Sequence, residues 1–383
     1  MPAVSSRFRR QSQFLLTALC AVALSSPAVA QGGSPQPRLE LADSAKAASR
    51  PATGELRRDF VRNQAIIGLG VYAPAFATTV ATEGVGWVAS YLAIAGGTYI
   101  AAAEVSRELK VTDPMQRLAT WMPLHGAAAG VIFGAMVDGS RRETAAAVLG
   151  GALAGTALGL WRGRGMDMDE ASATIAGADV GALAAYGAAT FAGLTDQGGR
   201  NRTRLAATLG GMVVGAPLGH AYVALAPYRV TQGDQLAMAA TAGVGMLAGL
   251  TVIARDPNPT QRQIGGALTF GGLAGLIAGD RLFASRYDHT EGDGTLIIGG
   301  GVAGGLMGAG VALLAGGSTS RWSTKTAGLT TLGAAAGVAW SQYYLQPAAD
   351  GAVRPGALRF DPAGIVAAAM RMNGAYTLAT IRF

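Results

Sequence analysis

The chain has 383 residues, of which 50% are hydrophobic and only 14% are charged, and its mean hydropathy is +0.31. Soluble domains carry about 25% charged residues, so this composition favours a membrane protein. The net charge of +7 comes from basic residues scattered among loops, with no basic stripe or interleaved aromatics, which argues against a nucleic-acid partner. Cys20 is the only cysteine, which excludes a disulfide within the chain and a thiolate metal site.

The N-terminal segment has the pattern of a secretory signal peptide. Arginines cluster within residues 7–10, residues 14–24 form a short apolar core, and an A-x-A cleavage site ends at Ala30. We therefore predict that residues 1–30 are removed and that the chain is exported. Residues 31–55 combine Gly, Ser, Pro, Ala and charges without periodicity, and we predict a disordered tether there.

From residue 56 onwards the chain is a series of apolar stretches of about 20 residues, which is the length that crosses a membrane. Alanine dominates and the stretches are too long for ordinary strands, so the sequence predicts an all-α fold of roughly ten helices. Thr260 and Asp234 stand just before two stretches, as N-caps should. The expected helices span residues 63–81, 85–105, 117–137, 143–161, 172–193, 204–225, 235–254, 264–284, 295–315 and 324–345.

Residues 141–345 contain an internal repeat. A Leu-Gly-Gly-like triplet recurs about every 60 residues, a period typical of repeat arrays. Each unit holds two apolar stretches separated by an acidic loop. We predict a tandem array of antiparallel helical hairpins in 141–345, preceded by N-terminal helices in 56–140. The triplets lie at 149–151, 209–211, 270–272 and 332–334.

Glycines recur four residues apart within these stretches. An interior glycine costs an exposed helix about 0.5–1 kcal/mol relative to alanine. The spacing leaves a groove on one helix face, where a neighbouring backbone can approach closely, so it predicts Gly-x-x-x-Gly packing. The predicted helix-packing residues are Gly151, Gly155, Gly159, Gly271, Gly275, Gly279, Gly300, Gly304 and Gly308.

Through these runs the chain resembles glycine-zipper helical membrane proteins of Gram-negative cell envelopes. The resemblance implies residence in the envelope and association of helices, and it carries no activity and no site residues. Loops alternate between a more basic and a more acidic set. With an exported N-terminus, ten spans place the basic set inside, as the positive-inside rule prefers. We expect an envelope membrane, the inner one favoured over the outer, with the lipid bilayer as partner and self-association through glycine faces.

Polar side chains inside apolar stretches are the candidate functional residues. Asp179 lies in the middle of its stretch, and a carboxyl at membrane depth tends to mark a pathway or a pair. His220 in one repeat unit and the Asp280-Arg281 pair in the next unit occupy the same position, near the end of an apolar stretch. These four residues form a candidate polar path. The alternative is that Arg281 extends to the interface and that Asp179 hydrogen-bonds a neighbouring helix.

Catalytic motifs are not found in the sequence. It has no nucleophile elbow, P-loop or zinc-protease helix, and His125, His220 and His289 are isolated. The glycines of 299–304 have dinucleotide-binding spacing but lack the acid about 20 residues on. We therefore predict a non-enzymatic structural or scaffold protein without cofactor or metal. Two alternatives stay open: a channel or transporter with a polar path near Asp179, and a soluble periplasmic helical solenoid that binds a partner.

The C-terminal tail, residues 346–383, differs from the rest. Two short strands around a turn near Asn373-Gly374 predict a small β-hairpin. The terminal Phe383 with its alternating apolar neighbours resembles the closing strand of outer-membrane barrel proteins. The preceding chain lacks the alternating ten-residue strands that a barrel needs.

Overall fold

The computed structural model describes residues 53–81, 83–194, 201–256, 258–314 and 324–345, and two short strands near the C-terminus. All of these belong to one unit, Thr53–Phe383. The described part is helical apart from the two strands, so the helical fold class is confirmed. The predicted signal peptide and residues 31–52 of the predicted tether lie outside the described residues.

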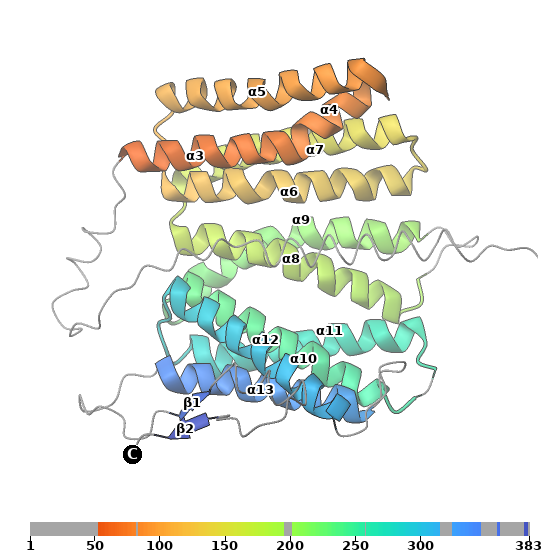
Figure 1. The fold of residues 1–383 in the computed structure, drawn as a ribbon, viewed down its shortest axis with the longest axis vertical. Helices are drawn as coiled ribbons and strands as arrows, with labels where there is room; N and C mark the ends of the chain where they lie inside the picture. Colours follow the sequence, from red (N-terminus) through yellow and green to blue (C-terminus); the bar gives the residue numbers. More distant parts are fainter. Residues whose placement is uncertain are drawn as a thin grey trace, which may run out of the picture. The chain divides into compact units, whose positions relative to one another are not determined.

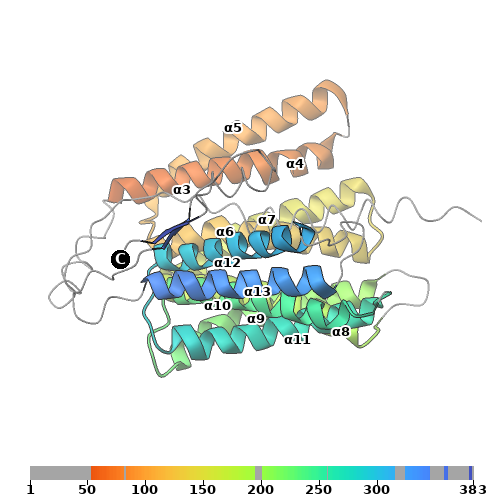
Figure 2. The same ribbon diagram turned by 60° about the horizontal axis from the view of Figure 1, so that its bottom comes forward.

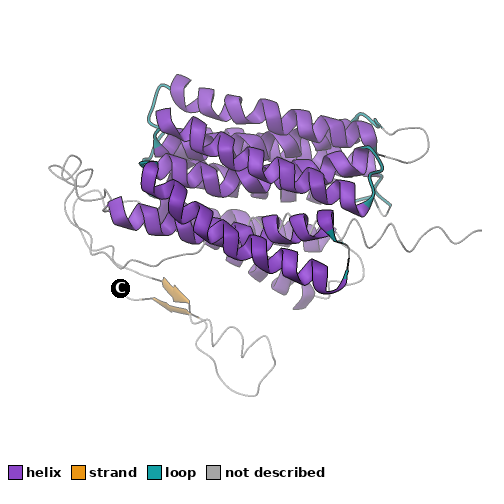
Figure 3. Ribbon diagram, turned by 90° about the horizontal axis from the view of Figure 1, so that it is seen from above, coloured by secondary structure: helices purple, strands orange, loops and turns teal. Residues whose placement is uncertain are grey.

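Long helices follow one another with short connections (Figure 3). The predicted bounds are close except for the first helix, which begins at Thr53 instead of residue 63, because its first turns are polar and show no apolar periodicity. The helices are α3 Thr53–Ile67, α4 Ala73–Val80, α5 Gly84–Glu108, α6 Asp113–Met136, α7 Arg141–Arg162, α8 Met168–Phe191, α9 Arg202–Leu225, α10 Gln232–Ile253, α11 Gln261–Gly279, α12 Glu291–Leu314 and α13 Thr324–Leu345.

Three short helical segments adjoin these helices. The π-helical η1 (Gly68–Tyr72) joins α3 to α4, a second π-helical segment η3 (Asp280–Ala284) extends α11, and the 3-10 turn η2 (Gly163–Gly165) follows α7. The extra residue of a π-helical turn rotates the following side chains around the helix axis. Such turns are frequent at functional sites. In η3 the shifted turn carries Asp280 and Arg281.

Reciprocal capping boxes set the start of four helices, and Thr290 and Asp293 make the same two bonds at the start of α12. In each box the N-cap side chain accepts from the backbone N–H three residues on, and that residue's side chain accepts from the N-cap N–H, which satisfies otherwise free donors. Thr260 is confirmed as an N-cap, but Asp234 is the third residue of helix α10 and Thr231 is the N-cap. The boxes are Ser140/Glu143, Asp167/Glu170, Thr231/Asp234 and Thr260/Gln263.

Helices that are consecutive in sequence form the most extensive pairs: α6 with α7, α8 with α9, α10 with α11, and α12 with α13 (Figure 1). This pairing is offset by one helix from the predicted repeat units. The acidic loops join one pair to the next, and do not connect the two members of a pair. Between pairs, α8 contacts α6 and α11, and α10 contacts α12 and α13 (Figure 2).

Glycines lie where paired backbones approach most closely. A Cβ atom added to Gly211 would overlap the carbonyl oxygen of Gly181, and one added to Gly215 would overlap that of Gly177. A Cβ atom added to Gly210, next to Gly211, would have no atom within 4 Å. Each of the nine predicted packing glycines faces the paired helix. On α7, Gly151, Gly155 and Gly159 face α6. On α11, Gly271, Gly275 and Gly279 face α10, and on α12, Gly300, Gly304 and Gly308 face α13.

Small apolar side chains are buried and many large apolar ones are exposed, which is the reverse of the usual arrangement in a soluble protein. More than half of the buried hydrophobic residues are alanines, whereas Val213 and Leu306 are 72% and 69% exposed. Seven of the described helices are long and apolar enough to cross a membrane: α5, α6, α7 with η2, α9, α10, α11 with η3, and α12. Six of the seven carry two or more exposed large apolar side chains, and α10 carries one, Val252. These features are consistent with a multi-helix membrane protein.

The C-terminal strands are β1 (Leu358–Phe360) and β2 (Ala379–Ile381), which pair antiparallel with Leu358 opposite Ile381. The turn predicted near Asn373-Gly374 lies outside the described residues, so a tight hairpin around it stays a prediction.

Candidate functional site

Asp179 has a partner that the sequence did not identify. Its Oδ1 lies 2.8 Å from Nε2 of His125 on α6, and the other ring nitrogen, Nδ1, lies 3.0 Å from the carbonyl oxygen of Trp121. The Asp179 side chain is 58% exposed, whereas that of His125 is 11% exposed. The carboxyl therefore opens to the outside of the α6–α8 contact, with the imidazole behind it.

Asp280, the first residue of η3, accepts hydrogen bonds from two tyrosines. The Tyr222 hydroxyl donates to Oδ1 at 2.5 Å, and the Tyr228 hydroxyl donates to the same oxygen. Burial and the hydrogen bond to Asp280 raise the pKa of Tyr228, which keeps this hydroxyl a donor at neutral pH. Arg281 places its Nε 3.6 Å from Oδ2 of Asp280 but is largely exposed, as expected for a side chain that reaches the interface.

His220, the remaining candidate, lies on α9 and buries an Nδ1 atom that has no hydrogen-bond partner. Within the described ranges, no hydrogen bond or ion pair joins Asp179, His220 and Asp280 to one another. The structure brings Asp179 to His125 and Asp280 to the tyrosines, and a single path through all four residues stays a prediction.

The most deeply buried polar cluster consists of Asp234, His289 and Gln342, which are 0%, 4% and 5% exposed. Oδ1 of Asp234 accepts from Nδ1 of His289 at 2.6 Å and from its backbone N–H at 3.1 Å. Nε2 of His289 lies 2.7 Å from Oε1 of Gln342. The cluster ties the start of α10 to the loop before α12 and to the end of α13.

Both ring nitrogens of His289 face oxygen atoms that accept hydrogen bonds. With the Gln342 amide in this orientation Nε2 must donate to Oε1, and the contact between Nδ1 and Oδ1 of Asp234 then needs a hydrogen on one of these two atoms. Burial lowers the pKa of His289, but the hydrogen bonds to Asp234 and Gln342 and the charge of Asp234 outweigh burial, and the pKa is raised overall. The raised pKa favours placing this hydrogen on His289, so that an imidazolium faces Asp234.

This charge state predicts how stability depends on pH. An unfolded imidazole titrates near 6.5 and the folded pKa of His289 is higher, so the proton stabilises the fold fully below about 6.5. The stabilisation is lost as the pH rises through the folded pKa. We expect the melting temperature in detergent to fall as the pH is raised from 6 towards 9, and to fall less in His289→Gln. A wild-type curve that matches the variant's would contradict this assignment.

Further polar contacts lie at the same end of the helices. Oδ1 of Asp169, at the start of α8, accepts from the backbone N–H of Gln232 at 3.1 Å, and its Oδ2 lies 3.3 Å from Nη2 of Arg229. Nη1 of Arg117, near the start of α6, lies 3.4 Å from Oε1 of Glu291, which begins α12. This acidic end of the unit is thus cross-linked by side chains from several helices.

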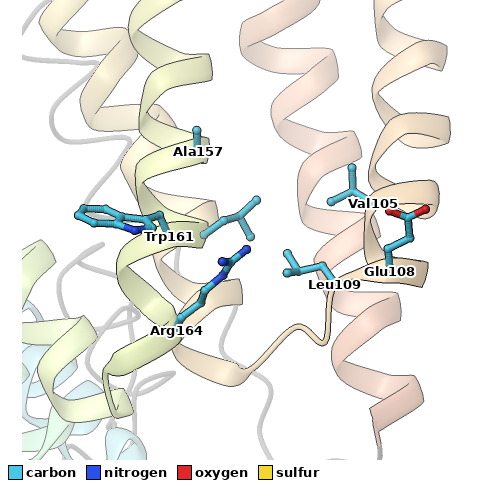
Figure 4. Close-up of a pocket in the computed structure, with 7 residues that line it drawn as sticks. Val105, Glu108, Leu109, Ala157, Trp161 and Arg164 are labelled. Atoms are coloured by element: carbon cyan, nitrogen blue, oxygen red, sulfur yellow. The ribbon is translucent and has the colours of Figure 1, made fainter.

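A pocket of about 410 Å³ opens between the end of α5 and the end of α7 (Figure 4). Arg164 points into the space from one side, and Leu109 lies on the other. The lining combines apolar surface with one acid and one cation, and offers no nucleophile. It consists of Val105, Glu108, Leu109, Ala157, Leu160, Trp161 and Arg164.

No group of three or more His, Cys, Asp or Glu side chains that could hold a metal ion occurs in the part of the chain that the structure describes. Comparison with known proteins found no matching protein family, no matching curated protein and no matching solved structure.

Proposed function

We propose that this chain is an exported multi-helix membrane protein of the cell envelope with a structural or scaffold role and no catalytic activity. The observation that carries the proposal is the arrangement of side chains by size. Small residues fill the helix contacts, and two or more large apolar side chains face outward on every helix of spanning length except α10, which exposes Val252. Water disfavours large contiguous apolar surfaces, whereas lipid tails accept them at no cost.

The glycine positions support the same proposal. Lipid gives helices no hydrophobic reason to associate, so close backbone packing becomes a main source of adhesion. Gly177, Gly181, Gly211 and Gly215 bring the α8 and α9 backbones together in this way. In our proposal, the Gly-x-x-x-Gly faces hold the helical hairpins together, and glycines left open, such as Gly210, are available for self-association.

Orientation follows from the loops. The inner membrane is favoured over the outer one, with the basic loops in the cytoplasm and the acidic end, which holds Asp234 and His289, outside. A soluble periplasmic solenoid is the alternative that the outward apolar side chains disfavour. A transport role would rest on the contact between Asp179 and His125, which is developed below.

The test is alkaline carbonate extraction of membranes from cells that express the tagged full-length chain, followed by separation of inner from outer membranes. We expect the protein to sediment with the inner-membrane fraction, because integral helices resist carbonate. A soluble periplasmic protein and an integral inner-membrane protein from the same cells serve as controls. Release of the chain into the carbonate supernatant would overturn the proposal in favour of the solenoid.

The same preparation can report orientation. Because Cys20 leaves with the signal peptide in our proposal, Arg142→Cys and Asp288→Cys each introduce a single thiol, at the basic and the acidic end respectively. In intact spheroplasts an impermeant maleimide is expected to label position 288 and to leave position 142 unlabelled. The reverse pattern would contradict the orientation and leave the membrane location intact.

A further inference from the structure

The contact between His125 and Asp179 lies halfway along two helices. His125 stands 12 residues after Asp113 and 11 before Met136 on α6, and Asp179 stands 11 after Met168 and 12 before Phe191 on α8. At 1.5 Å per residue each is about 17 Å from either end of its helix. Since the hydrocarbon core is about 30 Å thick, a helix that spans it holds these side chains near its midplane.

The helix α8 is surrounded by spanning helices. It is not one of the seven most apolar helices, but it packs against α6, α9, α10 and α11, which all are. Other Asp, Glu, Lys and Arg residues on these helices lie within five residues of a helix end. The only other His, Asp, Glu, Lys or Arg in the interior of these neighbours is His220 on α9, whose neighbour Gly219 packs against Ala173 and Gly177 of α8, and Gly177 lies two residues before Asp179. His220 is therefore the nearest other side chain of this kind on these helices. The helix α3, which also packs against α6, carries Asp59 and Arg62 on the side of Thr120, which the adjacent Asn63 contacts.

The hydrogen-bond geometry requires one shared proton. Nδ1 of His125 faces the Trp121 carbonyl oxygen, which can only accept, so Nδ1 carries a hydrogen. In a neutral imidazole Nε2 is then a bare acceptor. An ionised Asp179 is also only an acceptor, so the 2.8 Å contact between Nε2 and Oδ1 cannot form between a neutral ring and a carboxylate. It forms when one further proton lies on either atom.

We propose that His125 and Asp179 together bind one proton at the middle of the membrane. Because an apolar environment disfavours charged groups, the proton lies on the Asp179 carboxyl beside a neutral imidazole. Uptake from hydronium forms the carboxyl O–H bond and breaks one O–H bond of hydronium to leave water, and the pair is then neutral overall. Release returns a carboxylate and a neutral imidazole, leaving one net negative charge in an apolar environment, and removes the hydrogen bond between α6 and α8. Proton occupancy thus controls this helix contact, and the exposed face of the carboxyl is where the proton enters and leaves. This inference rests on the proposed membrane location.

The test uses the full chain in proteoliposomes and dicyclohexylcarbodiimide, an apolar reagent that modifies protonated carboxyl groups in apolar surroundings. We expect mass spectrometry to find Asp179 modified, with labelling that declines as the pH is raised, while Asp256 in an end loop stays unmodified. The variant Asp179→Asn is expected to lose the label. It is also expected to fold normally, because its amide N–H can donate to Nε2 without a bound proton.

A second readout tests the pairing itself. The infrared C=O band of a protonated carboxyl should be present in the wild type and absent in Asp179→Asn. In His125→Leu we expect the band to move to higher frequency, because the carboxyl loses its hydrogen-bond acceptor. Carbonate-resistant protein with no label on Asp179 at any pH, or with label that ignores pH, would overturn the proton site alone. An unmoved band in His125→Leu would overturn the pairing. Release by carbonate would overturn the proposed function as well.

Discussion

Replacing Gly211 by alanine is expected to destabilise the α8–α9 pair by about 1–3 kcal/mol, the usual cost of forcing atoms into a filled contact. The added methyl would overlap the Gly181 carbonyl oxygen and press on the Ala185 side chain. A backbone carbonyl cannot rotate away as a side chain can, so the helices must separate. The same change at the adjacent Gly210 meets nothing within 4 Å and is expected to be neutral or stabilising.

The two variants form a matched pair, because they make the same chemical change one residue apart on one helix. Thermal unfolding in detergent, followed by circular dichroism, measures the difference. A second pair on α10 repeats the comparison: Gly245 faces the Gly271 carbonyl oxygen, and Gly243 is open. Equal effects within both pairs would show that the glycines act through helix propensity alone, and would remove glycine packing from the proposed function.

The helices themselves could be predicted from the sequence, because each is a long apolar stretch between polar loops. The bounds of α5 to α13 were close for that reason. The start of α3 was missed, since a helix whose first turns carry Glu55, Arg57 and Arg58 has no apolar face there to detect. A polar helix start is visible only once its packing against neighbouring helices is known.

The partner of each helix was harder to predict than its position. The 60-residue repeat is compatible with pairing of helices across the acidic loops or across the basic loops. The glycine spacing is the same in all of these helices, so it does not distinguish the two. The structure pairs α8 with α9, whereas the predicted unit grouped α7 with α8. The choice depends on which glycine meets which carbonyl in space, and periodicity alone does not contain that information.

The candidate polar residues show the same limit. Asp179 stood out because it is an acid in an apolar stretch, but His125 is 54 residues away and looked isolated. The buried cluster was missed because Asp234 reads as an ordinary capping residue. One hint was present: Thr231-x-x-Asp234 and Thr290-x-x-Asp293 occupy equivalent helix starts, and His289 directly precedes the second. Aligning the two loops sets His289 opposite Val230, which is buried, and so marks His289 as a polar side chain at an apolar position.

Replacing Asp234 by asparagine is expected to cost about 3–5 kcal/mol, the typical penalty for leaving one member of a buried ion pair without its partner. Asp234 is fully buried, and its carboxylate also accepts from the Thr231 backbone N–H at 2.8 Å and from the Thr231 hydroxyl at 2.8 Å. The variant keeps the shape and loses the charge that faces His289. Unfolding in detergent near pH 6 measures the loss where His289 is charged.

Asp293 provides the control. It occupies the same position at the start of α12 and makes the same reciprocal bonds with Thr290, but its contacts are exposed to solvent. Asp293→Asn removes a cap interaction together with the weaker Coulombic effect of Asp293 on His289, and is expected to cost about 0.5–2 kcal/mol. The difference between the two variants therefore isolates burial and the His289 contact from helix capping.

A double replacement separates charge from packing. If the penalty in Asp234→Asn comes from an imidazolium left without its counter-charge, the pair Asp234→Asn and His289→Leu should recover part of it, because no buried charge then remains. If the two single penalties instead add, the cluster acts by shape and by its separate hydrogen bonds, and the charged state assigned to His289 is wrong. In the first case the energy of the contact between α10, α13 and the loop before α12 depends on pH, and in the second it does not.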